Sequence, residues 1–382
     1  MTERPGGYAL NAPQEPSHPP HPSARGSRVR GRGARSNSSG RFETEQREAF
    51  DDGWNDGWQA DDPPAPQLGT TVLRDASRSI VATNRSPDIS FDQSINPYRG
   101  CEHGCIYCYA RPSHAYWGYS PGLDFESVLF SKPDAPALLE QFFNRPAYTP
   151  KPIVIGANTD AWQPIERRLE ITRELLKVFA RYRHPVSFIT KSALVLRDLD
   201  ILGPMARDGL AKGAISVTTL DRGLSRDMEP RAAAPHRRLE TIRQLTEAGL
   251  PVSVMMAPII PALNDHEIEP LLEAAAAAGA RGAGYVLLRL PLEIKDLFRE
   301  WLAEKRPDAA SRVMSLIRQM RDGRDYDPDW ATRGRGKGPL AELVANRFRA
   351  AMKRHGLDGP LAQLDFSRFE RPLGSQGQPS LF

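Results

Sequence analysis

The three cysteines of this 382-residue chain lie within eight consecutive residues, and their spacing favours metal chemistry. They are Cys101, Cys105 and Cys108, separated first by three residues and then by two. An odd number of cysteines packed this closely does not make a disulfide framework. Thiolates are soft ligands that suit iron–sulfur clusters and zinc. The segment is therefore predicted to hold a metal centre.

Two kinds of metal centre compete for these thiols. A structural zinc ion needs four ligands, and His103 or His114 is near enough in the sequence to supply the fourth. An iron–sulfur cubane held by three thiolates leaves one iron without a protein ligand. Such an open metal position can bind and activate a small molecule. The short, glycine-containing spacing favours the cluster.

The elements that must position the cysteines alternate between short apolar runs and longer helical patterns. Candidate strands are Ile89–Ile95, Pro152–Ala157, Val186–Thr190, Ala214–Thr219, Val252–Ala257 and Gly284–Leu288. Candidate helices between them are Ala135–Asn144, Leu169–Tyr182, Val195–Asp208, His236–Ala248 and His266–Ala278. Strands that alternate with helices predict a parallel sheet with right-handed crossovers. Because a complete TIM barrel needs eight such units, the predicted fold class is α/β, a partial (βα)6 TIM-type barrel.

Composition divides the chain into four predicted parts. Residues 1–68 show no core-forming periodicity and are expected to be a disordered tail. Residues 69–290 are expected to form the barrel, residues 291–356 a helical C-terminal extension, and residues 357–382 a flexible tail. The helices expected in the extension are Glu293–Glu304, Ala309–Arg321 and Pro339–His355.

The cysteine motif after the first strand of a βα barrel resembles the radical S-adenosylmethionine (radical SAM) superfamily. The run from Asn96 to Arg111 resembles in particular its spore photoproduct lyase-related branch, whose members are often called DNA repair photolyase-like. Later strand ends resemble the same branch, namely Asn158–Glu166, Ile189–Ser192, Ser216–Asp221 and Ala257–Asp265. The resemblance covers roughly residues 70–355, about three quarters of the chain.

The resemblance implies an enzyme with two cofactors, a [4Fe–4S] cluster on the three cysteines and SAM. In that superfamily the iron without a protein ligand binds the amino and carboxylate groups of SAM, and one electron from the cluster splits the sulfonium. The resulting 5′-deoxyadenosyl radical abstracts hydrogen from a substrate. A single-electron donor of the flavodoxin or ferredoxin type is implied as a partner.

The SAM-binding residues implied by the resemblance lie mainly at strand ends, where parallel barrels bind their ligands. Tyr107, just before the third cysteine, is expected to pack on the adenine. Asn158 or Asp160 is expected to accept a hydrogen bond from the SAM ammonium group. Lys191 and Ser192 are expected to pair with its carboxylate. The structural alternative for each strand-end residue is that it caps the helix that follows.

Two further segments each have a functional and a structural interpretation. The loop Arg111–Gly122 carries His114, Tyr116, Trp117 and Tyr119. It is either a substrate-facing aromatic lid that stacks a base or a packed loop that shields the cluster from water. Residues 229–231, Glu-Pro-Arg, either line the barrel mouth or form a surface loop.

The substrate is the least determined part of the resemblance. Spore photoproduct lyase uses an additional cysteine as hydrogen donor, and this chain has no cysteine beyond the cluster three. Three hypotheses therefore stand. The chain is a radical SAM enzyme acting on a nucleic-acid lesion or modification, or one acting on a peptide or small metabolite. In the third it is a noncatalytic iron–sulfur or zinc module that binds DNA.

The net charge and the two ends of the chain are relevant to which macromolecules the protein binds. The formal net charge of +4 permits nucleic-acid binding without requiring it. The Arg- and Gly-rich stretch Ser23–Arg35 either contacts nucleic-acid phosphates or is a solvated tail. At the C-terminus, Gln378, Leu381 and Phe382 resemble the peptide by which bacterial DNA-processing proteins dock on the replication sliding clamp. The alternative is a tail that folds back on the barrel.

The hydropathy of the sequence and its few cysteines indicate where in the cell the protein is expected. No apolar run reaches the roughly 18 residues that a transmembrane helix needs, so no membrane partner is expected. The first residues lack the apolar stretch of a secretory signal. The expected location is the cytoplasm, where thiols stay reduced.

Overall fold

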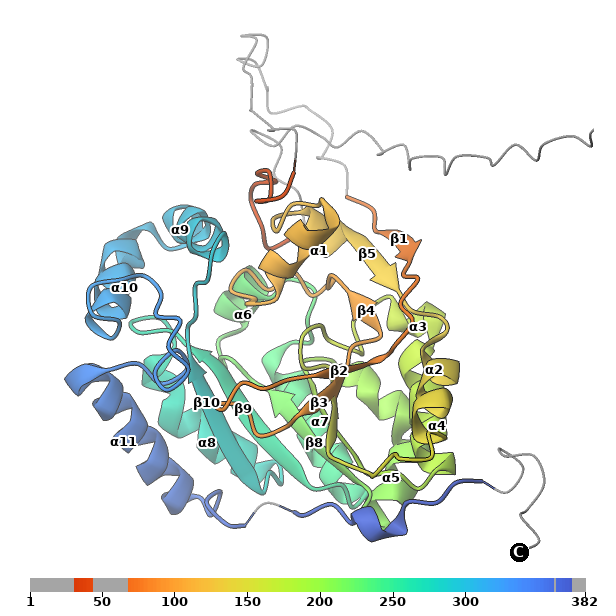
Figure 1. The fold of residues 1–382 in the computed structure, drawn as a ribbon. Coiled ribbons are helices and arrows are strands. Elements are labelled where there is room, and N and C mark those ends of the chain that lie inside the picture. Colours follow the sequence, from red (N-terminus) through yellow and green to blue (C-terminus); the bar gives the residue numbers. More distant parts are fainter. Residues whose placement is uncertain (1–30, 44–67, 361, 373–382) are drawn as a thin grey trace, which may run out of the picture.

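The computed structural model describes residues 31–43, 68–360 and 362–372, and within them six parallel strands form the central sheet (Figure 1). These strands are β3 (Gln93–Ile95), β6 (Ile153–Ile155), β7 (Val186–Thr190), β8 (Ala211–Ser216), β9 (Val252–Ile259) and β10 (Gly282–Leu287). They lie side by side in chain order, and β2 (Val81–Thr83) adds an antiparallel edge beside β3. The partial (βα)6 barrel predicted from the sequence is confirmed.

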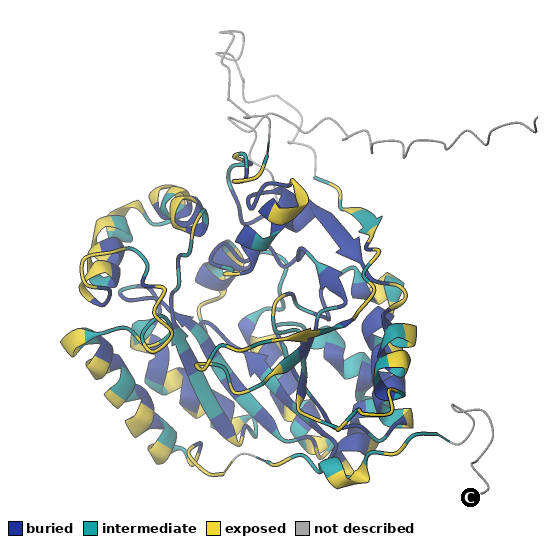
Figure 2. Cartoon of the chain, viewed as in Figure 1, coloured by how far each residue is buried: buried dark blue, intermediate teal, exposed yellow. Residues whose placement is uncertain are grey.

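Helices cover the outer face of this sheet, because a crossover between parallel strands returns through a helix. They are α2 (Ala135–Phe143), α4 (Ile171–Arg181), α5 (Leu199–Arg207), α7 (Pro235–Glu247) and α8 (Ile268–Ala277). Two shorter helices, α3 (Glu166–Leu169) and α6 (Arg222–Met228), lie in the connections after β6 and β8. The apolar residues of the covering helices face the strands, as Leu175, Leu176 and Phe179 of α4 do without any exposed surface. Figure 2 shows this division between buried inner and exposed outer faces.

A second, three-stranded sheet stands beside the barrel and was not expected from the sequence. It consists of β1 (Thr71–Arg74), β4 (Tyr98–Arg99) and β5 (Val128–Ser131), with β5 in the middle. Strands of two to four residues are too short to show an alternating pattern. As a result, Asn96, Pro97, the two residues of β4 and Gly100 separate the first barrel strand from Cys101.

The helical extension expected over residues 291–356 contains α9 (Ile294–Lys305), α10 (Pro307–Gln319) and α11 (Gly338–Arg354). Helices α9 and α10 pack on each other, and α11 lies along α8, where Arg347 pairs with Glu269 at 2.6 Å. Trp301 of α9 is fully buried and donates to the carbonyl of Asp227 at 3.0 Å. Among the described residues no helix is both long and apolar enough to cross a membrane.

Both tail predictions are wrong in part. Residues 31–43, here called the N-terminal strap, pack on the domain, with Arg32, Ala34 and Asn37 buried. Residues 362–372 also pack on it, where the ring of Phe369 meets Phe143 and His184 edge-on. The composition of these segments hid their order, because polar groups with distant hydrogen-bond partners leave no periodic signal.

Candidate functional site

The three cysteines lie on one loop built of tight turns. Cys101 and Cys105 are buried and Cys108 is half-buried. The amide of Cys108 donates to the carbonyl of Cys105 at 3.2 Å, and that of Gly104 to Cys101 at 3.3 Å. Gly104 has a φ of +67°, and a Cβ there would lie 2.6 Å from Glu126 Oε2. Glycine is therefore required at this point of the loop.

The chemistry of the donor set fits a cluster with three protein ligands better than a four-ligand zinc ion. Both histidines that were candidates for a fourth ligand are engaged elsewhere. His103 Nδ1 lies 3.4 Å from Asp160 Oδ2, and His114 Nε2 lies 2.9 Å from the carbonyl of Val128. In the part of the chain that the structure describes, no three His, Cys, Asp or Glu side chains are grouped to hold a single ion.

Cys105 is buried, and the charges of Lys191, Arg238 and Glu229 act on its thiol. Burial raises the pKa of Cys105 to about 12, and the positive charge of Lys191 opposes this rise. A thiol in such surroundings loses its proton when the sulfur binds a metal. Two of the three cysteine side chains are thus shielded from water, which suits an oxygen-sensitive centre.

The N-terminal strap lies directly against this loop. A Cβ on Gly33 would lie 1.7 Å from the carbonyl oxygen of Gly104, so only glycine fits there. The amides of Gly33 and Ala34 donate to the carboxylate of Glu126 at 2.9 and 2.8 Å. Arg111, three residues beyond the last cysteine, donates to the same carboxylate. Glu126 therefore joins the strap to the cysteine loop.

Asp160, predicted to bind the SAM ammonium, is a junction between three segments. Its carboxylate accepts from the amide of Trp162 at 2.9 Å, from Thr190 Oγ1 at 2.7 Å and from the amide of Lys191 at 2.8 Å. Burial opposes its ionisation, but the nearby His103 and these donors hold the pKa of Asp160 at about 2. It fixes the ends of β6 and β7 against the cysteine loop.

Asn158 lies two residues before Asp160 with its side chain exposed. Its own amide, and that of Thr159, donate to Asn96 Oδ1 at 2.8 and 3.3 Å. Asn96 thus holds the backbone after β6 in place, and the side-chain carboxamide of Asn158 is left accessible. Its predicted contact with SAM stays a prediction.

Lys191 and Ser192, predicted to pair with the SAM carboxylate, follow β7 directly. The hydroxyl of Ser192 accepts from the amide of Leu194 at 3.2 Å and caps the 3-10 helix η2 (Ala193–Asp198). Lys191 Nζ lies 5.8 Å from the ring centre of Tyr107. Although burial opposes it, the charges of Cys105 and Glu229 raise the pKa of Lys191. Ser192 has the capping role, and Lys191 remains a cation beside the cluster loop.

Tyr107, predicted to pack on adenine, points into the barrel instead of lying open. Its side chain is buried, and its hydroxyl donates to the carboxylate of Glu229 and lies 3.2 Å from Thr218 Oγ1. Arg238 donates to the same carboxylate, and both members of that ion pair are buried. Burial opposes ionisation, but Arg238 and Lys191 hold the pKa of Glu229 at about 2.

Some of these residues were missed by sequence reasoning. Glu126 has no exposed surface, and it shares the segment from Leu123 to Phe130 with the equally buried Asp124. Carboxylates flanked by Leu, Phe and Val in this way indicate buried, paired charges. Arg238 lies on the buried face of α7 with Ile242 and Leu245, but the arginines around it in the sequence hid this position.

The aromatic loop Arg111–Gly122 divides between its two interpretations. It begins as the 3-10 helix η1 (Arg111–Trp117), which buries His114. Tyr116 and Trp117 remain 69% and 44% exposed, enough for either ring to stack on another molecule. One side of the loop therefore packs into the protein through His114, and the other side exposes the rings of Tyr116 and Trp117.

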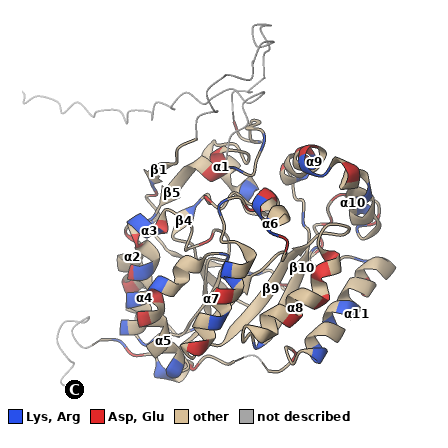
Figure 3. Cartoon of the chain, turned by 180° about the vertical axis from the view of Figure 1, so that it is seen from behind, with Lys and Arg blue, Asp and Glu red and all other residues tan. Residues whose placement is uncertain are grey.

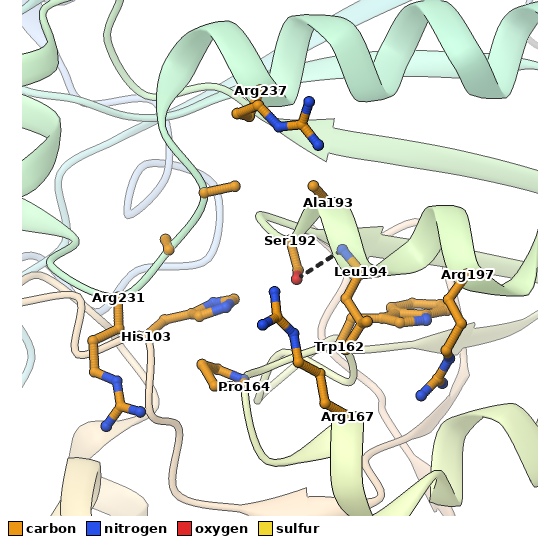
Figure 4. A pocket seen from close by; sticks show the side chains of 12 residues that line it. His103, Trp162, Pro164, Arg167, Ser192, Ala193, Leu194, Arg197, Arg231 and Arg237 are labelled. Atoms are coloured by element: carbon orange, nitrogen blue, oxygen red, sulfur yellow. Dashed lines mark hydrogen bonds between the residues drawn. The ribbon is translucent and has the colours of Figure 1, made fainter.

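A pocket of about 530 Å³ opens at the carboxyl ends of β6, β7 and β8, beside the cysteine loop (Figure 4). Its lining is unusually basic, with four arginines and one histidine. The lining residues are His103, Trp162, Pro164, Arg167, Ser192, Ala193, Leu194, Arg197, Arg231, Ala232, Ala233 and Arg237. The mouth of the barrel is thus hollow at the edge where parallel barrels bind ligands.

Comparison with known proteins identifies relatives of this chain. The model of the radical SAM superfamily matches residues 95–275. An uncharacterized protein of Mycobacterium tuberculosis is 35% identical over 243 residues, 62% of this chain and 72% of the relative. One from Methanocaldococcus jannaschii is 30% identical over 173 residues, 45% of this chain and 62% of the relative.

Solved structures show the same fold. A point mutant of spore photoproduct lyase superposes with a TM-score of 0.54 and 17% identity, covering 75% of this chain and 80% of the other. Spore photoproduct lyase complexed with a dinucleoside spore photoproduct also gives a TM-score of 0.54 and 17% identity, covering 74% and 79%. The shared architecture includes most of the barrel.

Proposed function

We propose that this chain, which belongs to the radical SAM superfamily, is an enzyme that acts on a nucleic-acid lesion or modification. The cofactors of the superfamily are a [4Fe–4S] cluster and SAM. When bound, they supply a 5′-deoxyadenosyl radical that abstracts hydrogen from the substrate. The observation that carries the enzyme chemistry is the single loop with three thiols, for which the described residues offer no fourth ligand, beside an accessible pocket.

The chain's own residues divide the work around these cofactors. Cys101, Cys105 and Cys108 would hold the cluster. Lys191, a cation fixed at the end of β7, would pair with the SAM carboxylate, and the exposed amide of Asn158 would accept from its ammonium. These contacts are proposals.

The two remaining SAM assignments act less directly. Asp160 would serve as a positioning residue, because its lone pairs are already occupied by protein donors. Tyr107, with its hydroxyl bound to Glu229, would offer only its ring to the adenine. Ser192 would act on SAM only indirectly, because its hydroxyl caps η2 and so fixes the backbone beside Lys191.

The nucleic-acid substrate is supported by two kinds of observation. Spore photoproduct lyase, which shares the fold, has been solved with a dinucleoside photoproduct. The exposed rings of Tyr116 and Trp117 lie beside arginines, with the guanidinium of Arg99 4.2 Å from the Trp117 ring centre. Aromatic rings interleaved with cations suit stacked bases. The reaction of spore photoproduct lyase itself is not proposed, because no cysteine beyond the cluster three is present.

The first experiment tests the enzyme chemistry. After anaerobic reconstitution, dithionite and SAM should yield 5′-deoxyadenosine, and Cys105→Ala should abolish it. If wild type forms none and the variant behaves identically, the enzyme proposal fails and a noncatalytic metal module becomes the better account.

The second experiment tests the substrate class. Deuterium from labelled substrate should appear in 5′-deoxyadenosine when damaged DNA or RNA is supplied. Transfer from a peptide or metabolite pool, and none from nucleic acid, would move the proposal to the alternative substrates.

Partners and location are proposed from the sequence. Radical SAM enzymes need an electron donor, and a flavodoxin- or ferredoxin-type protein in the cytoplasm would serve. The clamp-like residues Gln378, Leu381 and Phe382 lie outside the described residues, as does most of the Arg- and Gly-rich stretch. A C-terminal peptide should bind the sliding clamp, and Leu381→Ala with Phe382→Ala should abolish this. Binding that ignores both substitutions would refute the docking proposal.

A further inference from the structure

We infer that the pocket beside the cysteine loop is a phosphate-binding site for the substrate, in which Arg167 and Arg237 contact the phosphate. The inference rests on the proposed function and specifies how its substrate would be held. The ligand chemistry is a phosphate group of a nucleotide or of a nucleic-acid strand.

The form of the pocket suits such a group. At about 530 Å³ it has the size of a small-molecule site. In Figure 4 the side chain of Arg167 rises between His103 and Ser192, while Arg237 lies across the opposite side of the same pocket. Arg167 belongs to α3 and Arg237 to α7, so the two guanidinium groups come from separate crossovers. The ribbon in Figure 3 marks Lys and Arg positions in blue on α3, α7 and α6.

The other two arginines of the pocket are already neutralised. Arg197 pairs with Glu166 at 2.8 Å and with Asp198 at 2.9 Å. Arg231 pairs with Glu102 at 3.1 Å. These pairs hold their guanidinium groups to the walls.

Among the described carboxylates, Glu240 feels the charge of Arg237, but its hydrogen bonds go to Arg243 and Gln244. Asp160 faces His103, and within residues 31–43, 68–360 and 362–372 neither Arg167 nor Arg237 has an ion-pair partner. Both side chains are exposed. A guanidinium fork matches two oxygens of a phosphate, and two forks facing one space define an anion site.

SAM is a poor occupant of this basic space. Its sulfonium and ammonium charges outweigh its one carboxylate, so the molecule is a net cation. Two guanidinium groups without ion-pair partners would repel this cation, whereas they attract a negatively charged phosphate. The pocket therefore fits the substrate better than the cofactor.

The position of the pocket gives the phosphate a role in orientation. His103 lies between two of the cysteines proposed to hold the cluster, and Ser192 follows Lys191 just after β7. A phosphate held here would bring the adjoining sugar or base to the cysteine loop. Phosphate contacts fix register in this way without reading sequence.

The test is binding of a fluorescent single-stranded oligonucleotide to the full-length holoprotein, measured across salt concentrations. Because both guanidinium groups are proposed to contact one phosphate, Arg167→Gln together with Arg237→Gln should reduce the slope of log affinity against log salt by about 0.7, the value for one single-strand phosphate contact. That loss corresponds to about fourfold weaker binding near 0.15 M salt. Each single substitution should give part of that reduction. Arg281→Gln removes an equally exposed arginine just before β10, at the opposite end of the barrel, and should change neither quantity.

A labelled mononucleotide distinguishes the two sources of phosphate. Equal dependence on both arginines for mononucleotide and oligonucleotide supports a site for one phosphate group. Dependence for the oligonucleotide alone supports a site for a strand. Arg167→Lys, which keeps the charge, should restore most of the slope, which a folding defect would not allow.

The outcomes separate the inference from the proposed function. If wild type forms 5′-deoxyadenosine while neither substitution changes oligonucleotide binding, the pocket inference is refuted and the enzyme proposal stands. Weaker SAM binding with unchanged oligonucleotide binding would also refute it, because the site would then belong to the cofactor. If no 5′-deoxyadenosine forms but both slopes fall, the phosphate site stands and the enzyme proposal fails.

Discussion

Replacing Glu126 by glutamine should destabilise the fold more than any surface substitution. The carboxylate and its partner Arg111 have no exposed side-chain surface. Removing one member of such a buried pair typically costs about 3–5 kcal/mol. Arg111 keeps backbone carbonyl acceptors, among them Cys105 at 2.9 Å, which places the cost near the lower limit.

The strap adds a second contribution. A glutamine offers one acceptor oxygen where the amides of Gly33 and Ala34 now find two. One amide would face an NH₂ group, at about 1 kcal/mol. The expected loss is therefore about 4 kcal/mol. With a urea m-value of roughly 3 kcal/mol/M, the midpoint of unfolding should fall by more than about 1 M.

The matched control is Glu269→Gln on the half-exposed pair with Arg347. Because water screens that pair, its loss should cost less than about 1 kcal/mol. A Glu126→Gln midpoint within about 0.3 M of wild type would refute the reasoning that this carboxylate holds the strap to the cysteine loop.

Other expected outcomes follow from the same structure. Cys105→Ala should leave less than half of the wild-type iron and sulfide after reconstitution, measured by chemical assay; full retention would contradict the ligand assignment. Burial lowers the pKa of His184 to about 4, and Tyr148 Oη lies 2.7 Å from its Nε2. Since the unfolded imidazole takes up a proton near pH 6.5, stability should fall by about 3 kcal/mol as pH drops from 6.5 to 4. His184→Asn should flatten that dependence in urea titrations, and an unchanged pH profile would count against the buried neutral ring. Phe369→Ala should cost about 2 kcal/mol, because its half-buried ring packs on Phe143, and a cost near zero would mean that residues 362–372 are only loosely held.

The sequence was a good guide to the barrel because each strand and helix carries its own apolar pattern. The run Val186–Thr190 was predicted with the boundaries that β7 has. The three cysteines proposed to hold the cluster stand out equally in the sequence, since their spacing is local. The short strand β4, with two residues, carries no pattern of its own and was missed.

The polar contacts of the site were harder to predict because their partners are far apart in the chain. Asp160 accepts from Thr190 and Lys191, 30 and 31 residues away. Glu126 accepts from Gly33 across 93 residues. Residue type suggested a ligand for Asp160, but only the fold shows that protein donors already occupy its oxygens. Long-range pairing of this kind leaves no trace in composition or periodicity.

The N-terminal strap also sets an order of events during synthesis. Gly33 and Ala34 leave the ribosome first, yet their acceptor Glu126 follows more than ninety residues later. The three cysteines are made in that interval. A nascent chain therefore presents its thiols on a loop that the strap has not yet covered. A fragment that begins at residue 69, the domain boundary suggested by composition, would keep the loop in that uncovered state permanently.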